Sequence, residues 1–152
     1  MHKLLILLFI SVAFIGCSTE DELVDEFKTN RQLWESSGIV DYQWRERLSC
    51  ECGGVLLRDL FVVGGIKEKV EFDESQLFDG YTYQDVLNST STVEEAFNLI
   101  ESLLSQHVAS LYVAYDANYG FPTMISIDYD RNTIDDEIAF MYSNFEISLE
   151  LH

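Results

Sequence analysis

Two cysteines stand one residue apart, at Cys50 and Cys52, and a thiol pair at this spacing can do more than one kind of chemistry. In a fully extended strand, residues two apart lie on the same face with their Cα atoms about 6.5–7 Å apart, which is the upper limit for a disulfide. The glycines at 53–54 can supply the bend that a disulfide would need. The pair therefore fits a local disulfide, an unpaired buried pair, or a redox or soft-metal site.

A second group of side chains with chemical potential is acidic and lies in one short segment near the C-terminus. Oxygen ligands of this kind suit calcium, and the run Asp128-x-Asp130-x-Asn132 begins like an EF-hand loop. The pattern then fails, because Thr133 stands where that loop needs glycine and Ala139 stands where it needs glutamate. We expect a solvated acidic turn here, with a looser calcium site as the alternative. The acidic side chains of this segment are Asp128, Asp130, Asp135, Asp136 and Glu137, and Asp116 is a further candidate in the turn that precedes it.

The sequence contains no Gly-x-Ser-x-Gly motif, no phosphate-binding glycine loop and no His-Glu-x-x-His motif. His107 is the only histidine away from the chain ends, and its place at the end of a predicted helix favours contact with the helix dipole. A structural zinc needs four ligands, and Cys50 and Cys52 have no spaced histidine pair to complete them. We therefore predict that the protein is not an enzyme and has no catalytic residues, no resident metal and no cofactor.

The N-terminus carries an export signal that ends at Cys17. Lys3 is followed by an apolar run over residues 4–14 and then by Ile15-Gly16-Cys17. The run is too short to span a bilayer, which needs roughly 20 apolar residues. The segment resembles a bacterial lipoprotein lipobox, which implies cleavage before Cys17 and lipid attachment to it. The acidic stretch that follows, residues 18–22, resembles the signal after the lipidated cysteine in some surface-exposed lipoproteins of the Bacteroidetes.

Composition limits what the mature chain can be. Cleavage leaves 136 of the 152 residues, a length that suits one domain, and 47% of the chain is hydrophobic, so we expect a folded core. With 27 acidic and 9 basic residues the net charge is −18, which repels nucleic-acid phosphates and anionic lipids. We predict a signal peptide (1–16), a lipidated cysteine with an acidic tether and helix start (17–27), and a single domain (28–152).

The spacing of apolar residues predicts two helices. The first covers residues 21–37 and ends at Gly38. The second begins at a capping box formed by Thr92 and Glu95 and continues to about Gln106. Between the helices, residues 73–91 have no sustained period, so we expect a long loop there. Its apolar side chains, which we expect to pack, are Leu77, Phe78, Tyr81 and Tyr83.

The remaining apolar residues alternate with a period of two, which predicts six strands. In the first strand Val40, Tyr42, Trp44 and Leu48 point one way, and Gly64-Gly65 then marks a hairpin between 55–63 and 66–72. Two more strands cover 111–115 and 125–129. The last run, 137–151, changes register at Ser143-Asn144, which predicts a bulge. The expected fold is α+β, with two helices packed on antiparallel sheet in the order α-β-β-β-α-β-β-β.

Several motifs in this order resemble the DUF6174 family, a set of bacterial, largely lipoprotein or secreted domains without an assigned activity. The residues that carry the resemblance are Asn30-Arg31-x-x-Trp34-x-x-x-Gly38-Ile39-x-x-Tyr42, Cys50-x-Cys52, Tyr115-Asp116-x-x-x-Gly120-x-Pro122 and Ile125-x-Ile127-Asp128. The chain departs from the pattern at 53–54, where the family commonly has a proline after the second cysteine. The resemblance implies a domain identity and brings no catalytic residues.

Together these features predict a lipoprotein of the bacterial cell envelope, with the outer membrane as its expected location, held to the membrane by lipid on Cys17. We expect a non-catalytic binding or assembly module with an envelope protein as partner and no nucleic-acid partner. One alternative is a thiol-redox or soft-metal protein that uses Cys50 and Cys52. Another is an inhibitor of an envelope or secreted enzyme that presents residues 73–91.

Overall fold

The computed structural model describes residues 20–50, 56–106, 108–133 and 136–148. Its helices are α1 (Glu20–Ser37), α2 (Tyr83–Ser89) and α3 (Val93–Gln106), with a short 3-10 turn, η1 (Glu74–Gln76). Its strands are β1 (Tyr42–Ser49), β2 (Leu57–Val63), β3 (Ile66–Glu71), β4 (Ser110–Tyr115), β5 (Pro122–Asp128) and β6 (Ile138–Ile147).

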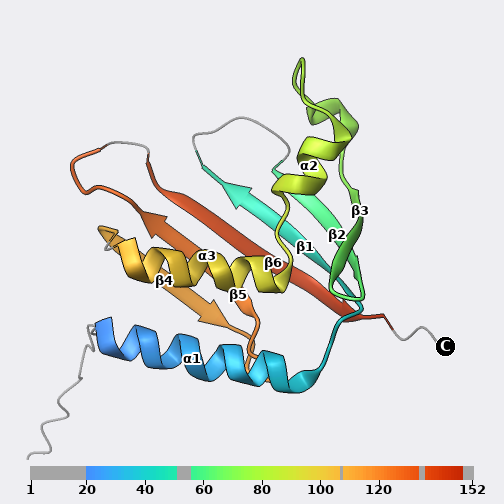
Figure 1. The fold of residues 1–152 in the computed structure, drawn as a ribbon. Coiled ribbons are helices and arrows are strands. Elements are labelled where there is room, and N and C mark those ends of the chain that lie inside the picture. Colours follow the sequence, from blue (N-terminus) through green and yellow to red (C-terminus); the bar gives the residue numbers. More distant parts are fainter. Residues whose placement is uncertain (1–19, 51–55, 107, 134–135, 149–152) are drawn as a thin grey trace, which may run out of the picture.

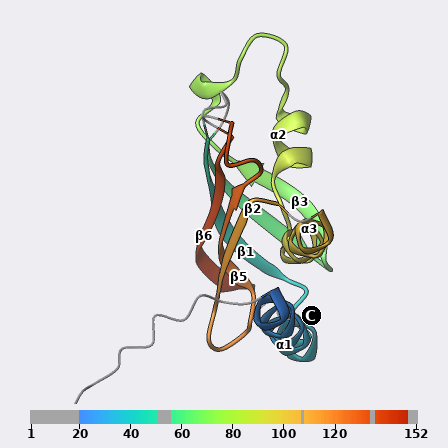
Figure 2. The same cartoon turned by 90° about the vertical axis from the view of Figure 1, so that its left-hand side faces the viewer.

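The six strands form one antiparallel sheet in the order β3-β2-β1-β6-β5-β4. Strands β1 to β3 form one half of the sheet and β4 to β6 the other, and β1 pairs with β6 where the halves meet. Helices α1 and α3 lie side by side on one face of the sheet (Figure 1, Figure 2). The predicted α+β class with an antiparallel sheet is therefore confirmed.

The predicted element order was wrong between residues 73 and 91, where η1 and α2 stand in place of a continuous loop. Helix α2 begins at a capping box, in which the Thr82 hydroxyl accepts a hydrogen bond from the Asp85 amide and the Asp85 carboxylate accepts one from the Thr82 amide. The helix has seven residues and buries only Val86. A helix that short shows no 3.6-residue apolar period, so its cap was the only sequence signal it offered.

The predicted break in the last strand is confirmed as a bulge. Asn144 has a φ of 52°, and the register of β1 against β6 shifts between Gln43 and Arg45. The shift keeps Tyr142 and Phe145, which are an odd number of residues apart, both packed in the core. The hairpin between β2 and β3 is confirmed as well.

An aromatic cluster fills the space between the helices and the sheet. The Trp34 ring of α1 meets Tyr42 and Phe121 edge-on, with ring centroids 5.6 and 6.2 Å apart. The Trp44 ring of β1 stacks on Tyr142 of β6 at 4.1 Å. These contacts join α1 to both halves of the sheet.

The turn between β4 and β5 packs closely against α1. The Asp116 carboxylate accepts hydrogen bonds from the amides of Asn118 and Tyr119, which closes the turn. Gly120 follows with a φ of 78°, and a Cβ atom at this position would collide with the backbone carbonyl oxygen of Asn30 in α1. Only glycine lets the turn approach the helix so closely.

We predict that Gly120→Ala destabilises the protein by about 2 kcal/mol more than Gly65→Ala. Gly65 has nearly the same φ, 77°, but nothing lies within 4 Å of a Cβ atom placed there. Gly65→Ala is therefore the control, and it should cost only the backbone strain of about 1–2 kcal/mol, whereas Gly120→Ala must also displace α1. Denaturant unfolding of both variants measures the difference. Equal losses would contradict the close contact between the turn and the helix.

Candidate functional site

The inner face of the sheet contains a charged pair that the alternation of apolar residues did not predict. Glu46 of β1 lies directly opposite Arg58 of β2, and the Nη2 atom of Arg58 is 2.8 Å from Oε1 of Glu46. The two residues are 0% and 4% exposed. Since an isolated buried charge is strongly unfavourable, each of these groups requires the other.

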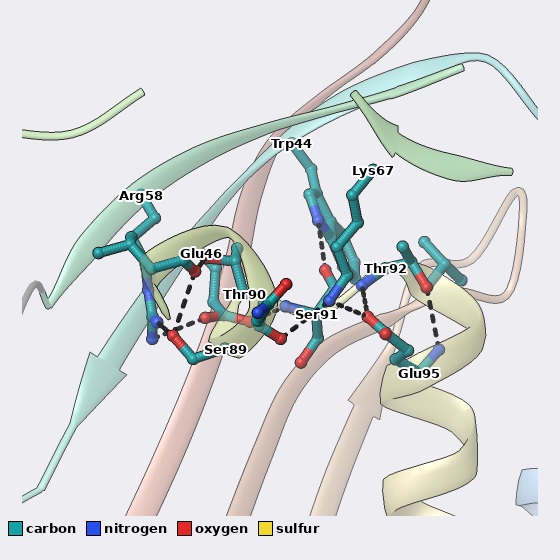
Figure 3. Close-up of polar contacts among 12 residues, drawn as sticks. Trp44, Glu46, Arg58, Lys67, Ser89, Thr90, Ser91, Thr92 and Glu95 are labelled. Carbon is teal, nitrogen blue, oxygen red and sulfur yellow. Dashed lines mark hydrogen bonds and ion pairs between the residues drawn. The ribbon is translucent and has the colours of Figure 1, made fainter. Parts of the chain in front are cut away.

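The segment between α2 and α3 closes over this pair (Figure 3). The amide of Ser91 donates a hydrogen bond to Oε2 of Glu46 at 3.0 Å, and Nη1 of Arg58 donates to the Ser89 hydroxyl at 2.9 Å. Nε1 of Trp44 donates to the Ser91 carbonyl at 3.1 Å. Residues 89–91 are therefore bonded to the sheet at three points.

The start of α3 is fixed by the same part of the sheet. The Tyr42 hydroxyl accepts a hydrogen bond from the Val93 amide at 2.9 Å. Thr92 and Glu95 form the predicted capping box, which is confirmed by hydrogen bonds of 2.8 and 3.1 Å. Lys67 of β3 reaches the Glu95 carboxylate at 2.8 Å (Figure 3). The capping residue of α3 is thus also tied to the sheet.

Burial dominates the electrostatics of this network. It raises the pKa of Glu46, while the positive charge of Arg58 and the hydrogen bonds from Ser91 act in the opposite direction. Burial also raises the pKa values of Tyr42 and Tyr142. Because the pair is enclosed by the sheet and the 89–91 segment, it offers no open cleft in which a substrate could meet it. What the arrangement can do is hold that segment in place.

Sequence reasoning missed Glu46, although a signal was present. The inward positions of β1 are Tyr42, Trp44, Glu46 and Leu48, and the apolar pattern was followed from Trp44 directly to Leu48. A charge at an inward position predicts an opposite charge on a neighbouring strand. The partner, Arg58, could be identified only once the register of β1 and β2 was known.

A second feature is a projecting lobe, residues 73–90, which contains η1 and α2 and extends beyond the end of the sheet (Figure 1, Figure 2). We call it the aromatic lobe, because its three aromatic side chains are all partly exposed to solvent. Phe78 and Tyr81 are each 51% exposed and Tyr83 is 44% exposed, so the expectation that all the apolar side chains here pack was wrong. Leu77 does pack against the core.

The aromatic lobe is held firmly to the fold despite its exposed rings. The Tyr83 ring stacks on Phe72, with centroids 6.1 Å apart, and its hydroxyl accepts a hydrogen bond from the Val70 amide of β3 at 2.9 Å. The Asp73 carboxylate caps η1 by accepting from the Ser75 amide. The α2 capping box fixes the other end of the loop. The rings are therefore presented by a preorganised segment.

The other residues predicted from chemistry are placed as follows. Cys17, Cys52 and His107 lie outside the described residues, so lipid attachment, the Cys50–Cys52 disulfide and the thiol or soft-metal hypothesis stay predictions. Cys50 directly follows β1.

The acidic segment after β5 forms a turn. The backbone amide and the side-chain amide of Asn132 both donate hydrogen bonds to the Asp130 carboxylate. These two hydrogen bonds lower the pKa of Asp130. The amide of Asp130 donates to Asp136 at 2.8 Å. Asp135 lies outside the described residues. Among those that are described, no group of three or more His, Cys, Asp or Glu side chains is placed to hold a metal ion.

Comparison with known proteins gives a family. The family model described as a family of unknown function, DUF6174, matches residues 26–147, which is most of the chain. No curated protein and no solved structure matches. Within the described part of the chain, no helix is both long and apolar enough to cross a membrane.

We predict that Glu46→Ala lowers the free energy of unfolding by about 3–5 kcal/mol, because it leaves Arg58 buried and unpaired. The double variant Glu46→Leu, Arg58→Leu should lose less than the single variant, since no charge is then left without a partner. Asp59→Ala is the matched control. Its pair with Arg45 joins the same two strands on the outer face with side chains 34% and 37% exposed, and it should contribute about 1 kcal/mol or less. Denaturant unfolding of the wild type and the three variants tests this, and equal losses for Glu46→Ala and Asp59→Ala would contradict it.

Proposed function

The chain belongs to the DUF6174 family, and we propose that it is an envelope-anchored lipoprotein whose domain works as a non-catalytic binding module. One observation carries the proposal: the aromatic lobe exposes the rings of Phe78 and Tyr81 on a segment that is itself capped, stacked through Tyr83 and hydrogen-bonded. Aromatic side chains dominate the energetics of protein interfaces, and a preorganised segment loses little conformational entropy on binding. The lobe is therefore the surface that we expect to meet a partner.

The arrangement of polar groups supports binding over chemistry. Glu46 and Arg58, the most deeply buried charges described, contact each other and the 89–91 segment. On the outer face of the sheet, Arg45 forms two hydrogen bonds with Asp59, each 2.7 Å long. These charges are engaged in holding the fold, whereas a general acid or base needs to reach a substrate.

A lipid on Cys17 would suit this use of the lobe. Only Ser18 and Thr19 separate Cys17 from the first residue of α1, so the helix start would lie within about 10 Å of the lipidated residue. The aromatic lobe lies at the other end of the molecule from the start of α1 (Figure 1, Figure 2). An anchored molecule would thus hold its N-terminal end at the membrane and carry the rings away from it.

The same observation favours a second candidate, an inhibitor of an envelope or secreted enzyme. A rigid projecting segment with exposed rings has the form needed to enter a partner's cleft. Inhibition is a particular outcome of binding, so it uses the same lobe. The two candidates differ in whether the captured partner is an enzyme whose activity falls when the lobe is bound.

We predict that Cys17→Ser abolishes membrane attachment in a bacterial host that processes lipoproteins. The wild-type chain should incorporate labelled palmitate and sediment with membranes. The variant should do neither, because the sulfur that receives the lipid is absent. Ser18→Ala is the control and should leave both unchanged. Palmitate incorporation by the Cys17→Ser chain would overturn the assignment of this residue.

We also predict that a photo-reactive benzoylphenylalanine at position 78 yields a covalent adduct of defined mass with a protein of the cell envelope. The same amino acid at position 112 is the control, because Tyr112 is 57% exposed but lies on β4, away from the lobe. Irradiated cells of the bacterium that encodes the chain are analysed by electrophoresis and mass spectrometry. An adduct from position 112 and none from position 78 would contradict binding through the lobe.

A further inference from the structure

The composition of the aromatic lobe indicates what kind of surface it meets, and the following inference rests on the proposed binding role. We propose that the lobe docks on a protein that presents an apolar pocket bordered by lysine and arginine side chains. The evidence is the charge of the lobe, the engagement of the neighbouring cations, and the interaction that exposed rings make with positive charge.

The charged side chains of the lobe are all acidic. Residues 73–90 contain four carboxylates and no lysine, arginine or histidine. The carboxylates belong to Asp73, Glu74, Asp79 and Asp85. Two of them stand next to or two residues from an exposed ring: Asp79 follows Phe78, and Asp85 is two residues after Tyr83. Any surface that covers the rings must therefore also accept negative charge.

The lysines of the adjacent strand do not offset this charge, because both have other partners. Lys67 of β3 is paired with Glu95 at 2.8 Å, and it reaches the base of the lobe only at the Asn88 carbonyl, to which it donates at 3.1 Å. Lys69 contacts Glu71 at 2.8 Å, and its Nζ atom lies 3.9 Å from the centre of the Phe61 ring on the outer face of the sheet. The negative potential at the lobe is therefore available to a partner.

Lysine and arginine would satisfy both features of the lobe at once. Their charged groups attract the carboxylates, and they also bind the faces of exposed aromatic rings. An apolar pocket between them would take the Phe78 ring, which has no polar group to keep solvated. An acidic or nucleic-acid surface would be repelled, since the chain as a whole has a net charge of −18.

The experiment varies the charge of the lobe without disturbing its structure. Asp73 and Asp85 cap η1 and α2, so the variant is Glu74→Gln with Asp79→Asn. The control is Asp25→Asn with Glu26→Gln, which changes the net charge equally but lies on exposed positions of α1, far from the lobe (Figure 1). Each full-length protein carries benzoylphenylalanine at position 78. The yield of the covalent adduct is measured in isolated envelopes from about 0.05 M to about 0.5 M sodium chloride, a range over which charge screening strengthens several-fold.

We expect the wild-type adduct to decline as salt rises. The lobe variant should give an adduct yield lower by on the order of 5-fold at low salt and a weaker salt dependence, while the α1 control should match the wild type. If the adduct yield changes neither with salt nor with either pair of substitutions, the proposal of a partner with lysine and arginine at its pocket is overturned, and the binding role is kept. An equal decrease in both variants would also overturn it, because the effect would then be that of net charge alone. Absence of any adduct at position 78 would overturn the binding role itself.

Discussion

The buried pair of Glu46 and Arg58 is the constraint on which the rest of the structure depends. Two charges that are 0% and 4% exposed are tolerated only where they meet each other and where further hydrogen bonds replace part of their lost hydration. The sheet supplies the pairing through the register of β1 and β2, and the 89–91 segment supplies the hydrogen bonds. The pair therefore requires both the sheet register and the position of that segment.

The buried pair also determines the positions of the two elements that flank the 89–91 segment, α3 and the aromatic lobe. Toward the C-terminus, it sets where α3 begins, since Ser91 is bonded to Glu46 and Val93 to Tyr42. Toward the N-terminus, Ser89 ends α2 and is bonded to Arg58. The aromatic lobe is thus fixed at its base by buried charges and along its side by the contact of Tyr83 with β3. A segment held this way can display apolar rings without collapsing onto the sheet.

Most of the fold could be predicted from local signals. The Gly38 stop, the Gly64-Gly65 hairpin, the Thr92 capping box and the register change at Ser143-Asn144 each determine structure within a few residues of themselves, and all are present in the structure. The family was also identified from spaced motifs. Helix α2 was missed because it is short and its apolar residues show no period.

The candidate site was harder to predict, because it depends on contacts between residues far apart in the chain. Arg58 and Ser91 meet Glu46 only through the register of the sheet and the closure of the 89–91 segment. Exposure of Phe78 and Tyr81 is likewise a tertiary property, and by composition alone these residues looked like core. Hydrogen exchange tests the constraint most directly. If the buried pair holds the segment, the Ser91 and Val93 amides should exchange as slowly as those of the central strands β1 and β6. Exchange as rapid as that of an exposed turn would contradict it.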